Sequence, residues 1–262
     1  MQDAPDTASR AAARDQHNGW STLQRLWLIL AILTALAFAV FANFPHVDLT
    51  VSSAFFDGEE RFYARQSSFV VFARGLFNWI FTGTCVLAVA GMIATRTWSR
   101  RFLSLTFAQW LFLGACLGAG PGLVANLGWK DHWGRARPIT VTEFGGERTF
   151  TPIQTPGTQC IKNCSFVSGE ASSMFMVFFA AAFLFPAWSR QLWATGIIMG
   201  LLAGLIRMVQ GGHFLSDVIF AGIFMAMTAA LLFYAFRAIS ATGFEPVTGA
   251  SDRIARRDGT NA

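Results

Sequence analysis

The chain has 262 residues, of which 53% are hydrophobic, 15% are aromatic and only 13% carry a formal charge. This composition excludes a disordered protein and an ordinary water-soluble domain, and it is typical of a protein embedded mostly in lipid. The net charge of +5 comes from basic residues scattered along the chain rather than gathered in one patch, so nucleic acid is not an expected partner.

The first 25 residues are polar and rich in Ala, Asp and Arg, and they predict a disordered cytoplasmic tail. An apolar run follows at residues 26–44. It favours an uncleaved membrane anchor over a secretory signal, because it has membrane-spanning length and a long polar lead. Residues 45–74 mix apolar and charged side chains, which indicates a partly amphipathic segment on the outer surface.

Charged residues bracket six long runs without charge, and a helix needs about 20 mostly apolar residues to cross the hydrocarbon layer. Five runs are long enough, and the fifth in order is short unless it continues past Arg207. We therefore expect an all-α membrane protein with six transmembrane helices in one domain, residues 26–237, followed by a cytoplasmic tail at 238–262. The runs are 26–44, 75–95, 102–129, 171–189, 191–206 and 218–236.

Arginines crowd the links after the second, fourth and sixth runs, and this bias marks those ends as cytoplasmic. The arginines are Arg96, Arg100, Arg101, Arg190, Arg237, Arg253, Arg256 and Arg257. An even number of spans then leaves both termini in the cytoplasm. The opposite ends of the helices face the non-cytoplasmic side.

Five strong polar residues fall at those opposite ends: Lys130, Arg137, Arg207, His213 and Asp217. An ionisable group at a membrane helix end is a candidate functional residue. The simpler interpretation is that such charges mark membrane boundaries. Boundary charges have no reason to converge in one pocket, whereas three cations, a histidine and a carboxylate are suited to phosphoryl chemistry.

Lys130 and Arg137 are seven residues apart, two turns if the chain stays helical, and Pro138 favours a helix exit. Two cations at this spacing can grip one anion, although a juxtamembrane basic stretch would look the same. His213 and Asp217 are four apart, so on a helix Asp217 would lie on the imidazole's face and fix its tautomer. A capping Asp beside an unrelated His is the alternative.

The segment 165–170 opens the fourth predicted span, and Ser and Gly residues at a helix start leave backbone N–H groups free for an anion. Ordinary N-capping explains the segment equally well by itself. Cys160 and Cys164 lie in the outer loop before it, in a space expected to be oxidising. We predict that they form a disulfide. No metal site is expected, because this loop offers too few ligands at workable spacing.

These residues resemble the type 2 phosphatidic acid phosphatase (PAP2) superfamily, which is related to vanadium haloperoxidases. Its signatures are K-x6-R-P, P-S-G-H and S-R-x5-H-x3-D. The first is intact here from Lys130 to Pro138, and the third runs from Arg207 to Asp217 with Ile206 in place of the usual Ser. The resemblance covers about residues 75–237 and implies a six-span helical bundle of the PAP2 and vanadium haloperoxidase type.

The resemblance also implies roles for individual residues. Lys130, Arg137 and Arg207 would bind the phosphoryl oxygens. Ser168 and the Gly169 amide would complete the cradle. His213 would be the nucleophile, oriented by Asp217, with no metal or other cofactor in the reaction.

The second signature departs from the family, because Glu170 stands where the general-acid histidine is expected. Glu170 could act as the acid only if it were protonated, or it could be a structural partner of Lys130 or Arg137. His132 is an alternative acid, although a polar loop residue is the simpler interpretation. The same S-G-E-A-S variant, with elements such as Trp133-Gly134-Arg135, resembles a bacterial subgroup of the superfamily.

The resemblance thus implies a phosphatase that removes phosphate from a lipid phosphate or diphosphate in the bilayer, through a phosphohistidine. Candidate substrates are a lipid A type phosphate, a prenyl diphosphate or a phosphatidate. The expected location is the bacterial inner membrane, with the site facing the periplasm. Two alternatives are an inactive relative that binds or moves phospholipid, and an assembly protein that packs through the glycine ladder of Gly114, Gly118 and Gly122.

Overall fold

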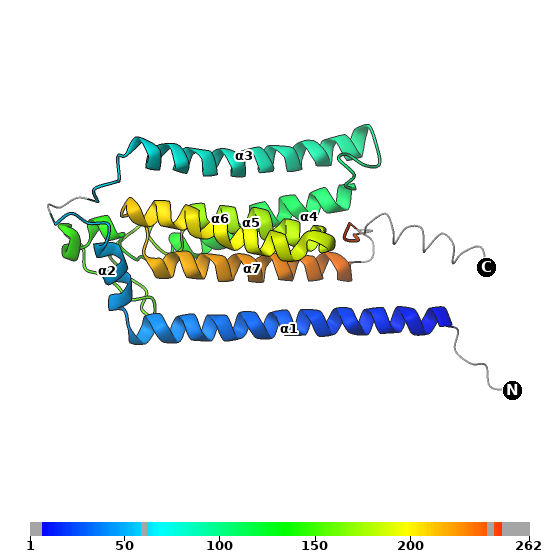
Figure 1. The fold of residues 1–262 in the computed structure, drawn as a ribbon, viewed down its shortest axis with the longest axis horizontal. Helices are drawn as coiled ribbons and strands as arrows, with labels where there is room; N and C mark the ends of the chain where they lie inside the picture. Colours follow the sequence, from blue (N-terminus) through cyan, green and yellow to red (C-terminus); the bar gives the residue numbers. More distant parts are fainter. Residues whose placement is uncertain (1–6, 59–61, 240–243, 248–262) are drawn as a thin grey trace.

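The computed structural model describes residues 7–58, 62–239 and 244–247, and it describes side chains from residue 24 onward. Long helices run nearly side by side, and a shorter helix lies across one end of the bundle (Figure 1). The main helices are α1 (Thr7–Asn43), α2 (His46–Ser53), α3 (Ser68–Thr97), α4 (Phe107–Leu117), the π-helix η1 (Gly118–Lys130), α5 (Gly169–Leu184), α6 (Ser189–Val209) and α7 (Leu215–Ala238). Three single-turn 3₁₀ helices, η2 (Pro138–Thr140), η3 (Thr142–Phe144) and η4 (Pro186–Trp188), complete the set.

The predicted all-α membrane architecture is confirmed. Each of the six apolar runs is helical, and α6 continues past Arg207 to Val209 as its length requires. Five helices are long and apolar enough to cross a membrane, and α5, at 16 residues, is shorter. Among the described residues the β-structure consists of isolated bridges only. The chain is therefore an integral membrane protein.

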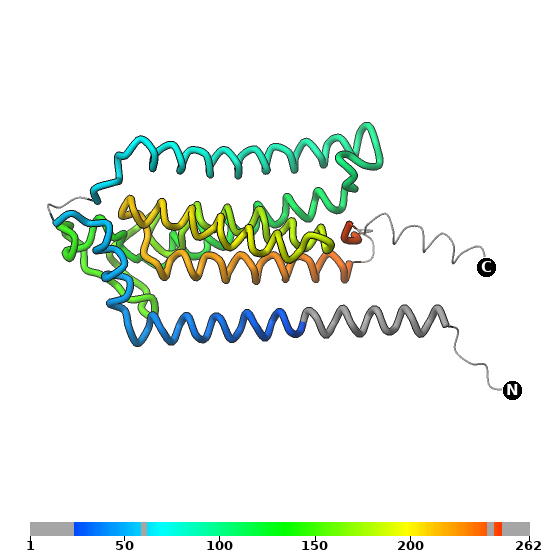
Figure 2. The backbone as a smooth tube through the Cα atoms, in the orientation of Figure 1, coloured from blue at the N-terminus to red at the C-terminus, as the bar shows by residue number. Residues whose placement is uncertain are grey.

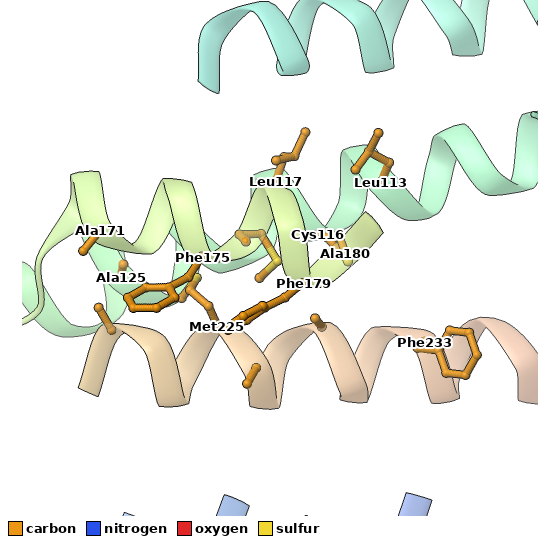
Figure 3. Close-up of a cluster of buried hydrophobic side chains, with 14 of the residues drawn as sticks. Leu113, Cys116, Leu117, Ala125, Ala171, Phe175, Phe179, Ala180, Met225 and Phe233 are labelled. Carbon is orange, nitrogen blue, oxygen red and sulfur yellow. The ribbon is translucent and has the colours of Figure 1, made fainter. Parts of the chain in front are cut away.

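The centre of the bundle is α5, which packs against α6 and also against α4 and α7, as Figure 3 shows for the last two. Glycines on the neighbouring helices make this packing close. A Cβ on Gly200 of α6 would lie 2.4 Å from the Phe175 ring, and one on Gly120 of η1 would lie 2.3 Å from Met176. Larger residues at these glycines would push the helices apart, so the sequence sets the spacing of the helices that carry the site.

Two observations concern the residues of the predicted tails. Helix α1 begins at Thr7, so most of the stretch expected to be disordered is helical, in keeping with the high helix propensity of its alanines. At the other end, Phe244 is buried beside Phe112, and the Val247 amide donates to the Leu184 carbonyl at 2.7 Å. Residues 1–6, 240–243 and 248–262 lie outside the described part of the chain, as do Arg253, Arg256 and Arg257.

The three glycines of the predicted ladder have different surroundings in the described chain. Gly114 faces Met92 of α3, where an added Cβ would lie 3.2 Å from the Met92 methyl group, so this glycine serves packing inside the bundle. Gly118 and Gly122 have open space beside them. Pro121 lies in η1, where a π-helix replaces the expected α-helix.

One end of the bundle gathers the elements that matter for function. Helix α2 lies across this end, together with the loop of residues 131–168, and the backbone trace shows α1 arriving there and α7 leaving (Figure 2). The C-terminal ends of η1 and α6 and the N-terminal ends of α3, α5 and α7 lie at the same end (Figure 1). Residues far apart in sequence are thereby brought together.

Candidate active site

All five polar residues singled out in the sequence lie at this end of the bundle. Lys130 is the last residue of η1, and Arg207 lies in the last turn of α6. Asp217 lies in the first turn of α7, with His213 just before that helix. Arg137 lies in the loop after η1, because the helix stops at Lys130. The loop, rather than two helical turns, therefore brings Arg137 to the site.

The three predicted phosphate-binding cations lie close enough to one another to interact electrostatically. Lys130 is only 8% exposed, and a Cβ on Gly169 would lie 3.0 Å from its Nζ. A Cβ on Gly212 would lie 2.5 Å from Nη2 of Arg207. Both glycines thus leave the space that the cationic groups occupy, and a larger residue at either position would displace a cation.

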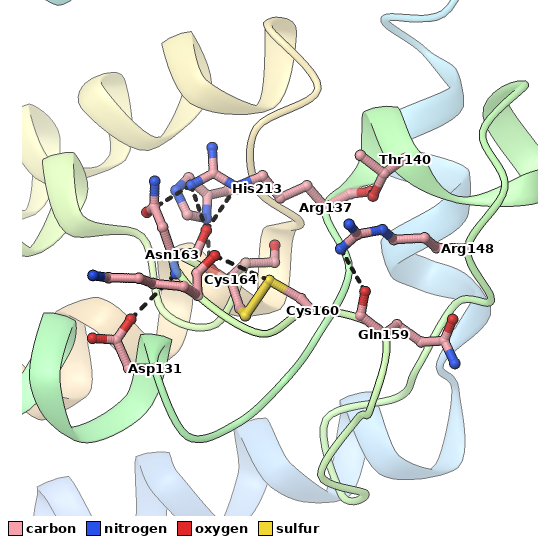
Figure 4. Close-up of a disulfide and its surroundings, with 11 residues drawn as sticks. Asp131, Arg137, Thr140, Arg148, Gln159, Cys160, Asn163, Cys164 and His213 are labelled. Atoms are coloured by element: carbon pink, nitrogen blue, oxygen red, sulfur yellow. Dashed lines mark hydrogen bonds between the residues drawn. A yellow bond between two sulfur atoms is a disulfide. The ribbon is translucent and has the colours of Figure 1, made fainter.

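Arg137 is held by the backbone that leads into α5 (Figure 4). Its Nη2 donates to the carbonyl and side-chain oxygens of Asn163, both at 2.8 Å. The predicted disulfide joins Cys160 and Cys164, with Cα atoms 5.6 Å apart, and so closes the loop that contains Asn163. The covalent loop therefore limits how far Arg137 can move.

His213 is fully buried and has its two ring nitrogens in different environments. Nδ1 lies 2.7 Å from the Ser165 carbonyl oxygen, which can only accept, so Nδ1 carries the proton. Nε2 has no hydrogen-bond partner among the described residues. Burial lowers the pKa of His213 to about 4. The ring is therefore neutral near pH 7, with the lone pair on Nε2.

Asp217 was expected to contact the His213 ring directly, but it supports the ring through neighbouring groups. Its Oδ2 lies 3.6 Å from Nδ1 of His213, farther than the Ser165 carbonyl, so the carbonyl is the direct partner of the ring. The same Oδ2 accepts the Phe214 amide at 2.8 Å and the Ser165 hydroxyl. Asp217 thus caps α7 and ties it to residue 165, so the capping and functional interpretations both hold.

Behind Asp217 lies an ion-pair chain that the sequence did not predict. Arg135 donates to Asp217 at 2.7 Å and to Asp48 of α2 at 2.8 Å, with all three side chains at most 1% exposed. Asp48 also accepts the Ser216 amide at 2.8 Å. Burial by itself lowers the pKa of Arg135, but the two carboxylates raise it above the usual value, so the guanidinium is charged.

Two further arginines join the site from the segment before α3 and from its first turns. Glu170 Oε1 accepts Nη2 of Arg74 at 3.0 Å and lies 3.3 Å from Nε of Arg207, without the alignment of a hydrogen bond. The predicted partners, Lys130 and Arg137, do not form ion pairs with Glu170 in the described chain. Arg65 and Arg74 line a cavity of about 450 Å³ together with Arg137 and Arg207.

Ser168 is the N-cap residue of α5, and its buried hydroxyl has no hydrogen-bond partner among the described residues. Its amide donates to the Asp217 carbonyl at 3.2 Å, which holds the start of α5 against α7. His132, the alternative acid, is exposed, and its Nδ1 lies 2.8 Å from the Leu127 carbonyl. The unpartnered Ser168 hydroxyl is available to an anion, whereas His132 is engaged locally.

The sequence did not predict the involvement of Asp48, Arg65 and Arg74 or the structural role of Arg135. Asp48 and Arg74 lie in the segment taken only as amphipathic, and their partners are 87 to 168 residues away along the chain. The sequence did contain one signal for Arg135. Arg135 stands between Lys130 and Arg137, in a stretch that the resemblance had already marked.

The family model of the PAP2 superfamily matches residues 102–240. The chain is similar to the lipid A 4'-phosphatase of Francisella tularensis subsp. novicida (strain U112), with 47% identity over 100 residues, 37% of this chain and 44% of the relative. The lipid A 4'-phosphatase of Rhizobium leguminosarum is 38% identical over 90 residues, 34% of this chain and 39% of the relative. The matched segment thus spans less than half of either relative, and no solved structure matches the chain. The family match covers more than half of the chain, and residues of the first and third signatures meet in one buried site. The protein therefore belongs to the PAP2 superfamily.

Proposed function

We propose that the protein is a membrane phosphatase that removes phosphate from a lipid phosphate through a phosphohistidine at His213. The observation that carries the proposal is the state of that side chain. Its Nδ1 proton is held by the Ser165 carbonyl, its Nε2 is buried without a partner, and the ring is neutral. A neutral imidazole fixed in this tautomer presents its lone pair as a nucleophile.

The cations supply the electrostatic part of the reaction. Lys130, Arg137 and Arg207 surround the place where charge gathers on the equatorial oxygens as phosphorus is attacked. Ser168 and the Gly169 amide, at the N-terminus of α5, are the neutral donors of the cradle. Because these groups are held by packing before substrate arrives, little reorganisation is needed during the reaction.

The reaction has two displacements. Nε2 of His213 attacks phosphorus, the bond to the lipid oxygen breaks, and the lipid leaves as an alcohol after taking a proton from water. The hydroxide left by that water then attacks phosphorus, and the electron pair of the N–P bond returns to Nε2. Inorganic phosphate is released and the histidine is neutral again.

Glu170 is assigned to positioning rather than to acid catalysis. Two guanidinium groups within 3.0 and 3.3 Å of its Oε1 favour the carboxylate form, which has no proton to donate. The carboxylate instead holds Arg207 and Arg74 at the cavity. The leaving group therefore has weaker proton assistance than in relatives that carry a histidine at this position.

The substrate proposed is a lipid A type phosphate, since the lipid A 4'-phosphatases share 38–47% identity with this chain across their matched segments. The site would face the periplasm, because the arginine-rich helix links lie at the other end of the bundle. We accordingly propose that the substrate lies in the bilayer of the bacterial inner membrane.

The test is phosphate release from purified protein against lipid A, a prenyl diphosphate and phosphatidate. We expect release that is fastest with lipid A and that disappears in His213→Ala. The exposed histidine variant His132→Ala is the matched control and should retain activity. Absence of release from every substrate would favour the alternative of a lipid-binding relative, and a strong preference for phosphatidate would exclude the proposed substrate.

A further inference from the structure

The cavity beside His213 holds more positive charge than one phosphoryl group can neutralise. Four arginines line it: Arg65, Arg74, Arg137 and Arg207. Lys130 adds a fifth cation nearby, and Glu170 is the carboxylate that pairs with this group. A phosphate monoester carries about −1.5 to −2 charges at neutral pH, so a net charge near +2 remains after one has bound.

The excess cations come from a different part of the chain from the motif residues. Arg137 lies in the loop after η1, and Arg207 and Gly212 lie in the segment that leads to His213, whereas Arg65 and Arg74 come from the segment before α3 and from its first turns. The cavity volume of about 450 Å³ is within the range of sites that hold a whole small ligand. The space and the charge therefore both extend beyond the reaction centre.

The position of Arg65 is set by contacts with the catalytic turn. Its carbonyl accepts from Nε2 of Gln210 at 3.4 Å, and the other end of the Gln210 amide accepts from Arg207 at 2.5 Å. Close by, the Phe62 ring packs on Gly211, which has a left-handed φ of +66° and leaves no room for a Cβ. The segment that carries Phe62 and Arg65 is thus held against the turn at residues 210 and 211.

Arg65 and Arg74 also act electrostatically on Arg137. Burial lowers the pKa of Arg137, and the positive charges of Arg74 and Arg65 lower it further, against the carboxylates of Glu170 and Asp217. Arginines that repel one another across a cavity gain when an anion enters between them. Arg65 forms no ion pair with the described carboxylates, so it is available to such an anion.

We infer that Arg65 and Arg74 form a second anion-binding site that recognises another phosphate on the same lipid headgroup, separate from the phosphate attacked by His213. This inference rests on the proposed function and narrows its substrate class to lipids with two phosphates. Arg65 determines specificity without touching the reacting phosphorus. Arg74 contributes through its remaining guanidinium nitrogen, Nη1, while its Nη2 and Nε stay on Glu170.

The test compares binding of two glycolipids that differ only in carrying two phosphates or one. Full-length protein with His213→Ala, which prevents turnover, is placed in phosphatidylcholine nanodiscs, so that no neighbouring anionic lipid supplies the second charge. We expect the lipid with two phosphates to bind at least about tenfold more tightly, as loss of a charged hydrogen bond implies. Adding Arg65→Ala should bring the two dissociation constants close together.

The matched control is Arg101→Ala, an exposed arginine at the far end of the bundle, which should leave the affinity ratio unchanged. If Arg65→Ala lowers the melting temperature, the comparison is repeated with Arg65→Gln, which keeps most of the side-chain stem. Equal affinities in the starting protein, or an unchanged ratio in the Arg65 variants, would overturn the inference. Failure of the proposed function shows separately, as absence of phosphate release by the wild-type protein.

Discussion

Arg135 donates to Asp217 over 2.7 Å inside the protein, where neither side chain is more than 1% exposed. The guanidinium also reaches Asp48 of α2, so one cation balances two buried carboxylates. It packs on the Phe214 ring, with 4.4 Å between the guanidinium carbon and the ring centroid. This chain of ion pairs joins α2 to the first turn of α7 and fixes the base of the active site.

Replacing Arg135 by Met should be strongly destabilising, since it leaves Asp48 and Asp217 buried without their cation. Removing one partner of a buried pair costs about 3–5 kcal/mol, and the melting temperature should fall by roughly 10 °C. Thermal unfolding in detergent measures this. Arg148→Met, an exposed arginine of the same outer loop, is the control and should change little. Equal melting temperatures for the two variants would show that the buried chain is not structurally important.

Glu170→Gln separates positioning from acid catalysis. The amide can still accept from Arg74 and Arg207 but carries no negative charge, so we expect a moderate rise in KM and a loss of kcat of less than about tenfold. The shape of the pH–rate profile should stay the same. A loss of kcat of about a hundredfold or more, together with disappearance of the alkaline limb, is the result expected of a general acid and would contradict the assignment.

The ring of His213 should titrate far below the usual range. Its pKa is about 4 in the folded protein, compared with about 6.5 for an exposed histidine. Labelled-histidine NMR, with His17, His46 and His132 replaced, would follow the midpoint directly. A midpoint near 6.5 would show that burial does not control this group.

The same shift predicts how stability depends on pH. Between pH 6.5 and pH 4 the unfolded chain binds a proton that the folded protein does not, so the free energy of unfolding falls as the pH is lowered. The contribution of His213 is complete above pH 6.5 and is lost by pH 4, with a size of about 3 kcal/mol. Measuring the free energy of unfolding of the wild-type and His213→Ala proteins across this pH range isolates the contribution of His213. Parallel pH dependences of the two proteins would contradict the prediction.

The disulfide should hold Arg137 through Asn163. We expect a thiol-reactive label to leave Cys160 and Cys164 unmodified until a reductant is added. Replacing both cysteines by Ala should weaken substrate binding, raising KM more than it lowers kcat, because the loop that carries the Asn163 acceptor becomes freer. Cys85→Ala, which removes a thiol outside the site, is the control. Labelling of both cysteines without reductant would contradict the prediction.

The features predicted from sequence were those with a local or regularly spaced signal. Apolar runs of membrane-spanning length predicted the six helices, and the order of the spans predicted that Lys130, Arg137, Arg207 and His213 would lie at one end. Cys160 and Cys164 are close in sequence, so their pairing needed no knowledge of the fold. The helix at residues 7–25 was missed because polar composition was taken to outweigh helix propensity.

The remaining features depend on tertiary packing. Nothing near Asp48 indicates that it is buried, since its partner Ser216 lies 168 residues away. The Ser165 carbonyl is the direct partner of His213 because α7 begins only at Leu215, and a helix drawn through both His213 and Asp217 would favour the carboxylate instead. The pairing of Glu170 with Arg74 requires α3 to begin beside α5, which no motif records.

Trapping of the phosphorylated enzyme tests the central claim most directly. Protein mixed with a lipid labelled on its phosphate is quenched within one turnover in alkali, and the labelled peptide is identified by mass spectrometry. We predict an acid-labile phosphoryl group on His213 in the wild-type protein, and neither label nor phosphate release in His213→Ala. Continued phosphate release by a folded His213→Ala protein would contradict the assignment of His213 as the nucleophile.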